Sequence, residues 1–229
     1  MESFEIRFDN VSFAYSSRRK VLEHASFILE QGQRYAIVGK TGQGKSTIFD
    51  LILGTYLPTE GQITVGGLLV NGDNIATIRA HTSCSYQLPF LMDDTIEANL
   101  RLLNPTISTQ KLTELMQLTQ VDVIVEKLPA GLNSRVGESG VQLSVGERKR
   151  IQLAQALAKE ASIYMFDELT ASLDQKTARF LMNSILSYLA GKTIIFIEHR
   201  LSMIEGIKEI LEFKHKTVSK TAYREIENR

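Results

Sequence analysis

Residues 35–53 read YAIVGKTGQGKSTIFDLIL. The opening run, 35–38, is apolar and β-branched, as expected of a buried strand in a parallel sheet. Residues 39–47, GKTGQGKST, match the pattern G-x-x-x-x-G-K-[ST], and the residues from 46 to 53 have the pattern of a helix that ends at Gly54. A strand, a glycine-rich loop and a helix in this order predict an α/β fold.

The chemistry of this loop suits a polyphosphate. Glycines let the backbone curl until several N–H groups point at one anion, and the helix that follows adds its positive end. Lys45 places a charge near the β and γ phosphates, and the Ser46 hydroxyl can bind Mg²⁺. Kinases, GTPases and ATPases share this pattern. The candidate nucleotide-binding residues of the loop are Gly39, Lys40, Thr41, Gly42, Gln43, Gly44, Lys45, Ser46 and Thr47.

A second apolar strand ends in two acids. Residues 163–168 read IYMFDE. At the carboxyl end of a parallel strand, Asp167 can reach the Mg²⁺ shell, usually through water. Glu168, one residue further on, is placed to polarise a water for in-line attack on the γ-phosphate. The two acids therefore predict nucleotide hydrolysis.

A short motif before a long helix identifies the family. Residues 143–147 read LSVGE and precede a helix predicted over 147–159. Together with the loop and the acidic strand, they make residues 4–205 similar to the nucleotide-binding domain of ATP-binding cassette (ABC) transporters. The motif resembles the family's signature, Leu-Ser-Gly-Gly-Gln, with Val145 in place of a glycine and Glu147 in place of the glutamine. A hydroxyl, a free N–H and a helix N-terminus all suit an anion.

The resemblance implies roles for residues in both halves of a dimer. Ser144, Gly146 and Glu147 would contact the γ-phosphate of ATP held by a second subunit. Asp174, in the segment Ser-Leu-Asp at 172–174, would cross the dimer interface and help to shape the water site.

Three further residues take roles from the resemblance. Tyr15 would stack its ring on adenine. Gln87, after a strand predicted over 83–86, would complete the Mg²⁺ coordination that Ser46 and Asp167 begin. His199 follows the strand predicted over 193–197 and would bond the γ-phosphate and orient Glu168. The expected catalytic residues are Glu168, His199 and Lys45, the metal ligands are Ser46, Gln87 and Asp167, and the ligands are ATP and Mg²⁺.

The resemblance also implies an architecture. We expect a P-loop NTPase (RecA-like) core with a mainly parallel sheet, an N-terminal antiparallel β subdomain and an inserted α-helical subdomain. The whole chain, 1–229, is then a single nucleotide-binding domain. Residues 1–87 and 159–213 form the catalytic core with the β subdomain, 88–158 form the helical subdomain with the signature, and 214–229 form a polar tail. Residues 207–213 and 216–219 are expected to make a reduced strand pair without the usual glycine turn.

The segment at 136–140, VGESG, resembles a short motif that marks exporters and contacts their transmembrane helices. We therefore expect an ATP hydrolase that drives an ABC exporter: ATP closes a head-to-tail dimer and hydrolysis opens it. The partners are a second nucleotide-binding domain and a transmembrane domain, on the same or another chain, at the cytoplasmic face of the cell membrane. The alternatives are the ATPase subunit of an ABC importer and a soluble, non-transport ABC ATPase.

Composition agrees with this interpretation. The 229 residues carry 26 basic and 26 acidic side chains, and this balance argues against a nucleic-acid binder that works by charge. The hydrophobic fraction of 43% is that of a globular chain. The single cysteine, Cys84, cannot form an internal disulfide, so a reducing compartment fits best. No stretch approaches the roughly 20 apolar residues that span a bilayer.

Overall fold

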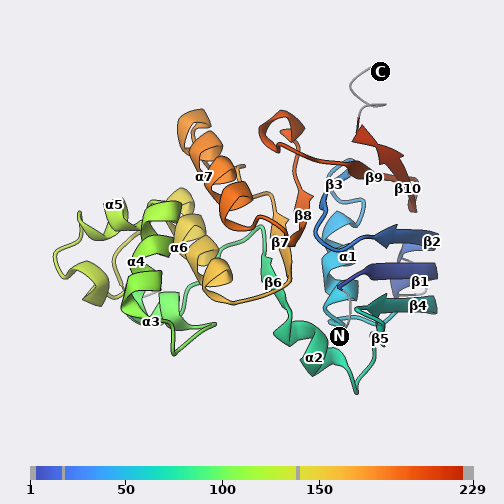
Figure 1. Cartoon of the computed structure of the whole chain (residues 1–229), viewed down its shortest axis with the longest axis horizontal. Coiled ribbons are helices and arrows are strands. Elements are labelled where there is room, and N and C mark those ends of the chain that lie inside the picture. Colours follow the sequence, from blue (N-terminus) through green and yellow to red (C-terminus); the bar gives the residue numbers. More distant parts are fainter. Residues whose placement is uncertain (1–3, 17–18, 138–139, 224–229) are drawn as a thin grey trace. The chain divides into compact units, whose positions relative to one another are not determined.

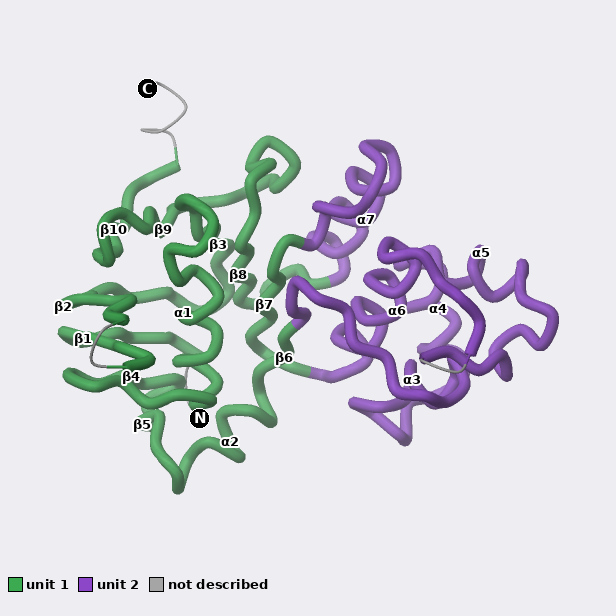
Figure 2. Tube along the Cα trace, turned by 180° about the vertical axis from the view of Figure 1, so that it is seen from behind, with its two compact units in different colours: residues 1–84, 161–168, 189–229 green, residues 85–160, 169–188 purple. Residues whose placement is uncertain are grey.

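The computed structural model describes residues 4–16, 19–137 and 140–223 (Figure 1). It divides into two compact units, coloured separately in Figure 2. Unit 1 comprises residues 1–84, 161–168 and 189–229, and unit 2 comprises residues 85–160 and 169–188. Among the described residues, no helix combines the length and the apolar character that crossing a membrane requires.

Unit 1 contains two sheets. The antiparallel sheet has the order β2-β1-β4-β5, built from β1 (Ile6–Ser16), β2 (Arg19–Leu29), β4 (Glu60–Val65) and β5 (Leu68–Leu69). The larger sheet has the order β10-β9-β3-β8-β7-β6. Its strands are β3 (Arg34–Val38), β6 (Thr82–Ser85), β7 (Ile163–Asp167), β8 (Thr193–Ile197), β9 (Glu209–Lys214) and β10 (Thr217–Ala222).

The order of the larger sheet brings three segments with candidate site residues to one edge. Strand β3 is parallel to both β8 and β9, and β7 is parallel to β8. The carboxyl ends of parallel strands lie at the same edge of a sheet, so the segments that follow β3, β7 and β8 emerge together. These segments are the glycine-rich loop, the acidic pair at 167–168 and the segment that holds His199.

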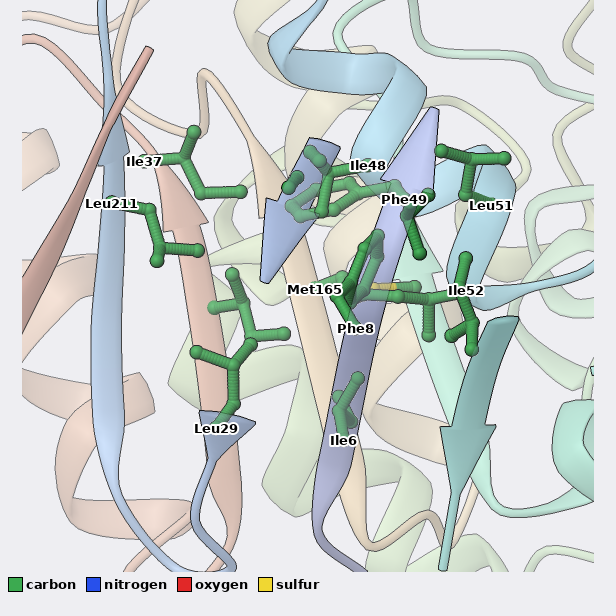
Figure 3. Packing of buried hydrophobic residues seen from close by; sticks show 14 of the residues in the cluster. Ile6, Phe8, Leu29, Ile37, Ile48, Phe49, Leu51, Ile52, Met165 and Leu211 are labelled. Atoms are coloured by element: carbon green, nitrogen blue, oxygen red, sulfur yellow. The ribbon is translucent and has the colours of Figure 1, made fainter. Parts of the chain in front are cut away.

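One apolar cluster joins both sheets of unit 1 to helix α1 (Lys45–Ile52) (Figure 3). Phe8 and Leu29 come from the antiparallel sheet, Ile37 and Met165 from the larger one, and Phe49 from α1. All of these side chains are at most 2% exposed. A core of this kind holds the loop before α1 in a fixed place, because the elements at both of its ends are buried. Helix α2 (Ile75–Ala80) adds Ile78 to the same cluster.

The C-terminal strand pair predicted from the sequence is present. Strands β9 and β10 pair antiparallel from Glu209–Ala222 to Lys214–Thr217, and β10 lies within the stretch expected to be a polar tail. The connecting residues His215 and Lys216 both have positive φ, 49° and 68°, so two non-glycine residues form the turn in the left-handed region. The Lys216 carbonyl accepts the N–H of Glu23, which ties the hairpin to β2.

Unit 2 is helical. Its helices are α3 (Ile96–Arg101), α4 (Thr109–Thr119), α5 (Val121–Val125), α6 (Val145–Ala158) and α7 (Gln175–Tyr188). Hydroxyl side chains cap three of them: Thr95 caps α3, Ser108 caps α4 and Ser144 caps α6. The structure therefore agrees with the predicted α/β class, with a mainly parallel sheet, an antiparallel sheet and an inserted helical part.

Candidate active site

Helix α1 begins at a glycine that no other residue could replace. Gly44 is its N-cap with φ 101°, and a Cβ added there would collide with Cγ1 of Val21. No side chain caps the helix, and its first turn holds no acid. No side-chain oxygen of the helix therefore takes the place of an incoming anion at its positive end. The N-terminus of α1 is therefore available to bind a phosphate.

Lys45 lies inside the loop. Lys45 is 7% exposed, and its ammonium donates to the carbonyls of Gly39 at 2.8 Å and Lys40 at 3.1 Å. Burial lowers the pKa of Lys45 below its ordinary value, while the nearby carboxylates of Glu168 and Asp167 act in the opposite direction. An incoming phosphate adds negative charge beside the ammonium and so favours its charged form.

A side chain of the loop occupies one of the loop's own donors. The N–H of Lys40 donates to Oε1 of Gln43 at 2.9 Å. A Cβ on Gly39, which has φ 148°, would come within 2.8 Å of the same oxygen. The side-chain oxygen of Gln43 thus occupies one of the backbone N–H groups that are expected to bind phosphate.

Ser46 and Asp167, two of the predicted metal ligands, are hydrogen-bonded to each other. The Ser46 hydroxyl donates to Oδ2 of Asp167 at 2.6 Å, and Asp167 ends strand β7 at 4% exposure. Hydroxyl and carboxylate oxygens are the ligand types that Mg²⁺ prefers, so this donor set fits the ion.

Glu168 combines a strained backbone with a histidine neighbour. Its φ is 49°, a value uncommon for a residue with a side chain, and its N–H donates to the carbonyl of Ile197 at 2.8 Å. Its Oε1 lies 3.6 Å from Nε2 of His199. The Glu168 side chain is 16% exposed and that of His199 is 54% exposed. The acid is therefore held in place while the histidine faces solvent.

Tyr15 belongs to an aromatic cluster on the same unit. Its hydroxyl lies 3.0 Å from Oγ1 of Thr47, the last residue of the loop. Its ring centroid is 4.9 Å from that of Phe13 and 5.1 Å from that of Tyr56, both in edge-on arrangements, and Arg19 lies over its ring. The sequence analysis singled out Tyr15 but missed Phe13 and Tyr56. The contact with Tyr56 joins residues far apart in the chain, and only the alternation along β1 could have indicated Phe13.

In unit 2, the signature residues form the start of α6. Ser144 is the N-cap, and it forms a reciprocal capping box with Glu147. A Cβ on Gly146 would come within 3.2 Å of both Ser172 and Leu173, so glycine lets the segment 172–174 approach closely. Val145 is 45% exposed, so the valine that departs from the family pattern points away from the packing.

The other predicted residues of unit 2 lie in loops. Asp174 is exposed, and its Oδ1 accepts the N–H groups of Lys176 and Thr177 at the start of α7. Hydrogen bonds from Thr177 hold the pKa of Asp174 below its usual range. Gln87 is exposed in the segment after β6. Of the exporter-like segment at 136–140, residues 138 and 139 lie outside the described residues.

Unit 2 also contains a groove that the sequence analysis did not find. A cavity of about 400 Å³ is lined mainly by residues 89–91 and 141–143, together with Gly137 and Arg148. Phe90 at its rim is 71% exposed, and Leu88 nearby is 81% exposed. The apolar run at 88–91 was the available signal, and only its exposure distinguishes it from a core segment.

A buried asparagine holds the segment beside this groove. Asn99 is fully buried and its amide exchanges hydrogen bonds with both the N–H and the carbonyl of Met92, at 2.8 and 3.1 Å. It also donates to the Thr95 carbonyl at 3.0 Å.

Comparison with known proteins identifies the family. A family model described as "ABC transporter" matches residues 22–171. The mycobactin import ATP-binding/permease protein IrtB of Mycolicibacterium smegmatis is 37% identical over 206 residues, which is 90% of this chain and 36% of that protein. The mitochondrial iron–sulfur clusters transporter ATM1 of Candida glabrata is 36% identical over 217 residues, which is 94% of this chain and 30% of that protein.

A solved structure of a bacterial Atm1-family ABC exporter with ATP bound matches with a TM-score of 0.93 and 31% identity, over 99% of this chain and 40% of that one. The chain thus spans about a third of the length of these relatives. The similarities favour the exporter type over the ATPase subunit of an importer and over a soluble ABC ATPase. The chain belongs to the ABC transporter family and is an ATPase domain of the exporter type.

Proposed function

We propose that this domain binds and hydrolyses MgATP and that the hydrolysis drives substrate translocation by an exporter. The observation that carries the proposal is the convergence at one edge of the larger sheet. Three adjacent parallel strands, β3, β7 and β8, lead into the phosphate-binding loop, the acidic pair and the histidine segment. This is the edge at which ligands bind in open parallel sheets.

The residues of unit 1 suggest how the reaction proceeds. The loop N–H groups and Lys45 hold the β and γ phosphates, and Tyr15 supports the base. Bound Mg²⁺, held by Ser46, Asp167 and Gln87, would neutralise charge that develops on the phosphate oxygens. Glu168 accepts a hydrogen bond from a water and takes its proton as the water oxygen bonds to the γ-phosphorus, with ADP as leaving group.

His199 acts on Glu168 and on the γ-phosphate. Its Nε2 lies 3.6 Å from the Glu168 carboxylate, close enough to align the acid after a small movement. A solvent-facing imidazole can donate to a phosphate oxygen from one nitrogen while the other is held. Together with Lys45, it stabilises the charge of the transition state.

We further propose that ATP is shared between two copies of the domain. Ser144, Gly146, Glu147 and Asp174 of one copy would approach the γ-phosphate bound by the other, with two-fold symmetry. The exposure of Ser144 and Asp174 supports this proposal, because a second chain can reach them. ATP then favours the dimer, since only the dimer makes both sets of contacts.

The transmembrane domain would contact unit 2. The groove beside Phe90, which Gly137 also lines, offers apolar surface for a helix of that domain, and the exporter-like segment at 136–140 is proposed to contact the same domain. The domain would then work at the cytoplasmic face of a membrane, with the subdomain division expected from the sequence. One relative, IrtB of Mycolicibacterium smegmatis, is described as an ATP-binding/permease protein, which supports a transmembrane domain on the same polypeptide.

Substitution of the proposed base tests the hydrolytic role. Glu168→Gln keeps the shape of the side chain and removes the base, so ATP turnover should fall by at least about a hundredfold. Binding of MgATP, measured by isothermal titration calorimetry, should persist. Lys45→Ala serves as the contrasting variant, because it should lose binding itself. Unchanged turnover in Glu168→Gln would refute the assignment of the base.

A further inference from the structure

The carboxylate of Glu147 accepts two hydrogen bonds from the serine of the signature motif, Ser144. Its Oε2 accepts the N–H of Ser144 at 2.8 Å and the hydroxyl of Ser144 at 2.8 Å. In return, the hydroxyl oxygen accepts the N–H of Glu147 at 3.2 Å. One oxygen therefore holds both donors of the residue that the proposed function assigns to the partner's γ-phosphate.

The contact with Glu147 occupies the only hydroxyl hydrogen of Ser144. A serine hydroxyl has a single hydrogen, and an ionised carboxylate can only accept. While its hydroxyl donates to Glu147, Ser144 has no hydroxyl hydrogen to donate to a phosphate oxygen. Within the described part of the chain, the N–H groups of Val145 and Gly146 have no hydrogen-bond acceptor. The start of α6 thus has open backbone donors next to an occupied hydroxyl.

The charge of Glu147 acts in the same direction. Burial raises the pKa of Glu147, but the hydrogen bonds from Ser144 and the charges of Arg150 and Lys127 together outweigh it and hold the pKa below its usual value, so the group is ionised at neutral pH. The cations facing it are Arg150 and Lys127. The guanidinium of Arg150 also donates to the carbonyl of Gln120 at 3.0 Å. A phosphate that approaches Gly146 therefore comes near an ionised carboxylate that forms no direct ion pair within the described residues.

We propose that Glu147 is a positioning residue that opposes closure of the ATP dimer. The inference rests on the proposed function, in which Ser144 contacts the partner's γ-phosphate. To make that contact, the Ser144 hydroxyl must leave the Glu147 carboxylate and turn its hydrogen to the phosphate. A glutamine at this position would hold the hydroxyl less tightly, because hydrogen bonds to a neutral amide are weaker, and its NH₂ could donate to the phosphate. Glu147 thus raises the ATP concentration at which two copies associate.

The test compares dimer formation in a background that does not hydrolyse ATP. The full 229-residue chain carrying Glu168→Gln is prepared with and without Glu147→Gln, and sedimentation velocity with MgATP measures the dimer dissociation constant. Loss of the charged competitor should favour closure about fivefold at each site, hence about 25-fold for the two sites of a symmetric dimer. Glu114→Gln is the matched control: it removes one exposed carboxylate of α4 that pairs with Lys111, and it should leave the dimer constant unchanged.

The sign of the effect separates the inference from a purely structural role. If Glu147 only capped α6, then Glu147→Gln would weaken the helix start and the dimer together. A dimer constant for Glu147→Gln that is within twofold of the parent, or weaker than it, overturns the inference while the ATP-dependent dimer of the parent stands. Absence of an ATP-dependent dimer in every variant overturns the proposed function, and the inference with it.

Discussion

The backbone of Glu168 gives a prediction that separates strain from chemistry. This residue has φ 49°, and the only backbone hydrogen bond described for its N–H goes to the carbonyl of Ile197. Strain of this kind persists only where surrounding structure enforces it, and it is common at functional sites. Replacing the residue by glycine should relieve the strain, whereas replacing it by alanine should keep the strain and remove the side chain.

The magnitude follows from the two opposing effects. The left-handed conformation costs a residue with a Cβ roughly 1–2 kcal/mol, and glycine avoids this cost. Glycine has the more flexible unfolded chain, which offsets about 0.4–1 kcal/mol of that gain. Glu168→Gly should therefore be about 1 kcal/mol more stable than Glu168→Ala. In a domain of this size, that corresponds to roughly 2–4 °C in the melting temperature.

Thermal and urea unfolding of the two variants without nucleotide would measure the difference. Both variants lack the proposed base, so both should have lost turnover, and their stabilities can be compared without any contribution from catalysis. An alanine variant that is as stable as the glycine variant, or more stable, would show that the backbone at 168 is unstrained and would refute this reasoning.

Three further predictions concern other parts of the chain. Asn99→Ala leaves the N–H and carbonyl of the half-buried Met92 without their side-chain partner and opens a hole in the core, so it should cost about 3 kcal/mol in urea unfolding, while the exposed Asn183→Ala should cost little. Similar losses for both variants would contradict the role of Asn99. Lys216→Gly relieves a turn residue at φ 68° and should stabilise the domain by about 1 kcal/mol in thermal unfolding; a loss of stability would contradict the strain. Gln43→Ala frees the N–H of Lys40 for phosphate, so ATP should bind about threefold more tightly by calorimetry, and weaker binding would contradict the competition.

Much of the fold could be predicted because its signals are local. The strand predicted over 193–197 is β8, and the helix predicted over 46–53 is α1 within a residue at each end. The helix predicted to begin at 147 begins at Val145 instead, because Ser144 and Glu147 form a capping box that brings the intervening residues into the first turn. Likewise, Asp174 sets the start of α7 by accepting N–H groups that follow it.

The candidate site was predictable where a residue type and a spacing define the chemistry. The pairing of Ser46 with Asp167 follows from a loop and an acid at the ends of parallel strands. The hydrogen bonds between Ser144 and Glu147 could have been inferred from the capping-box spacing alone. The contact of Tyr15 with Tyr56 and the role of Asn99 could not, because each depends on which distant segments the fold brings together. The exposure of Phe90 also needed the structure, since an apolar residue is more often buried.

The central claim is that one ATP is held by the phosphate loop of one copy and the signature of another. Mixing two inactive variants tests it most directly. Lys45→Ala disables the loop but keeps the signature, and Ser144→Arg disables the signature but keeps the loop. A heterodimer of the two variants has one intact site, so the mixture should hydrolyse ATP, although neither variant does so alone. A mixture as inactive as its components would contradict the shared site.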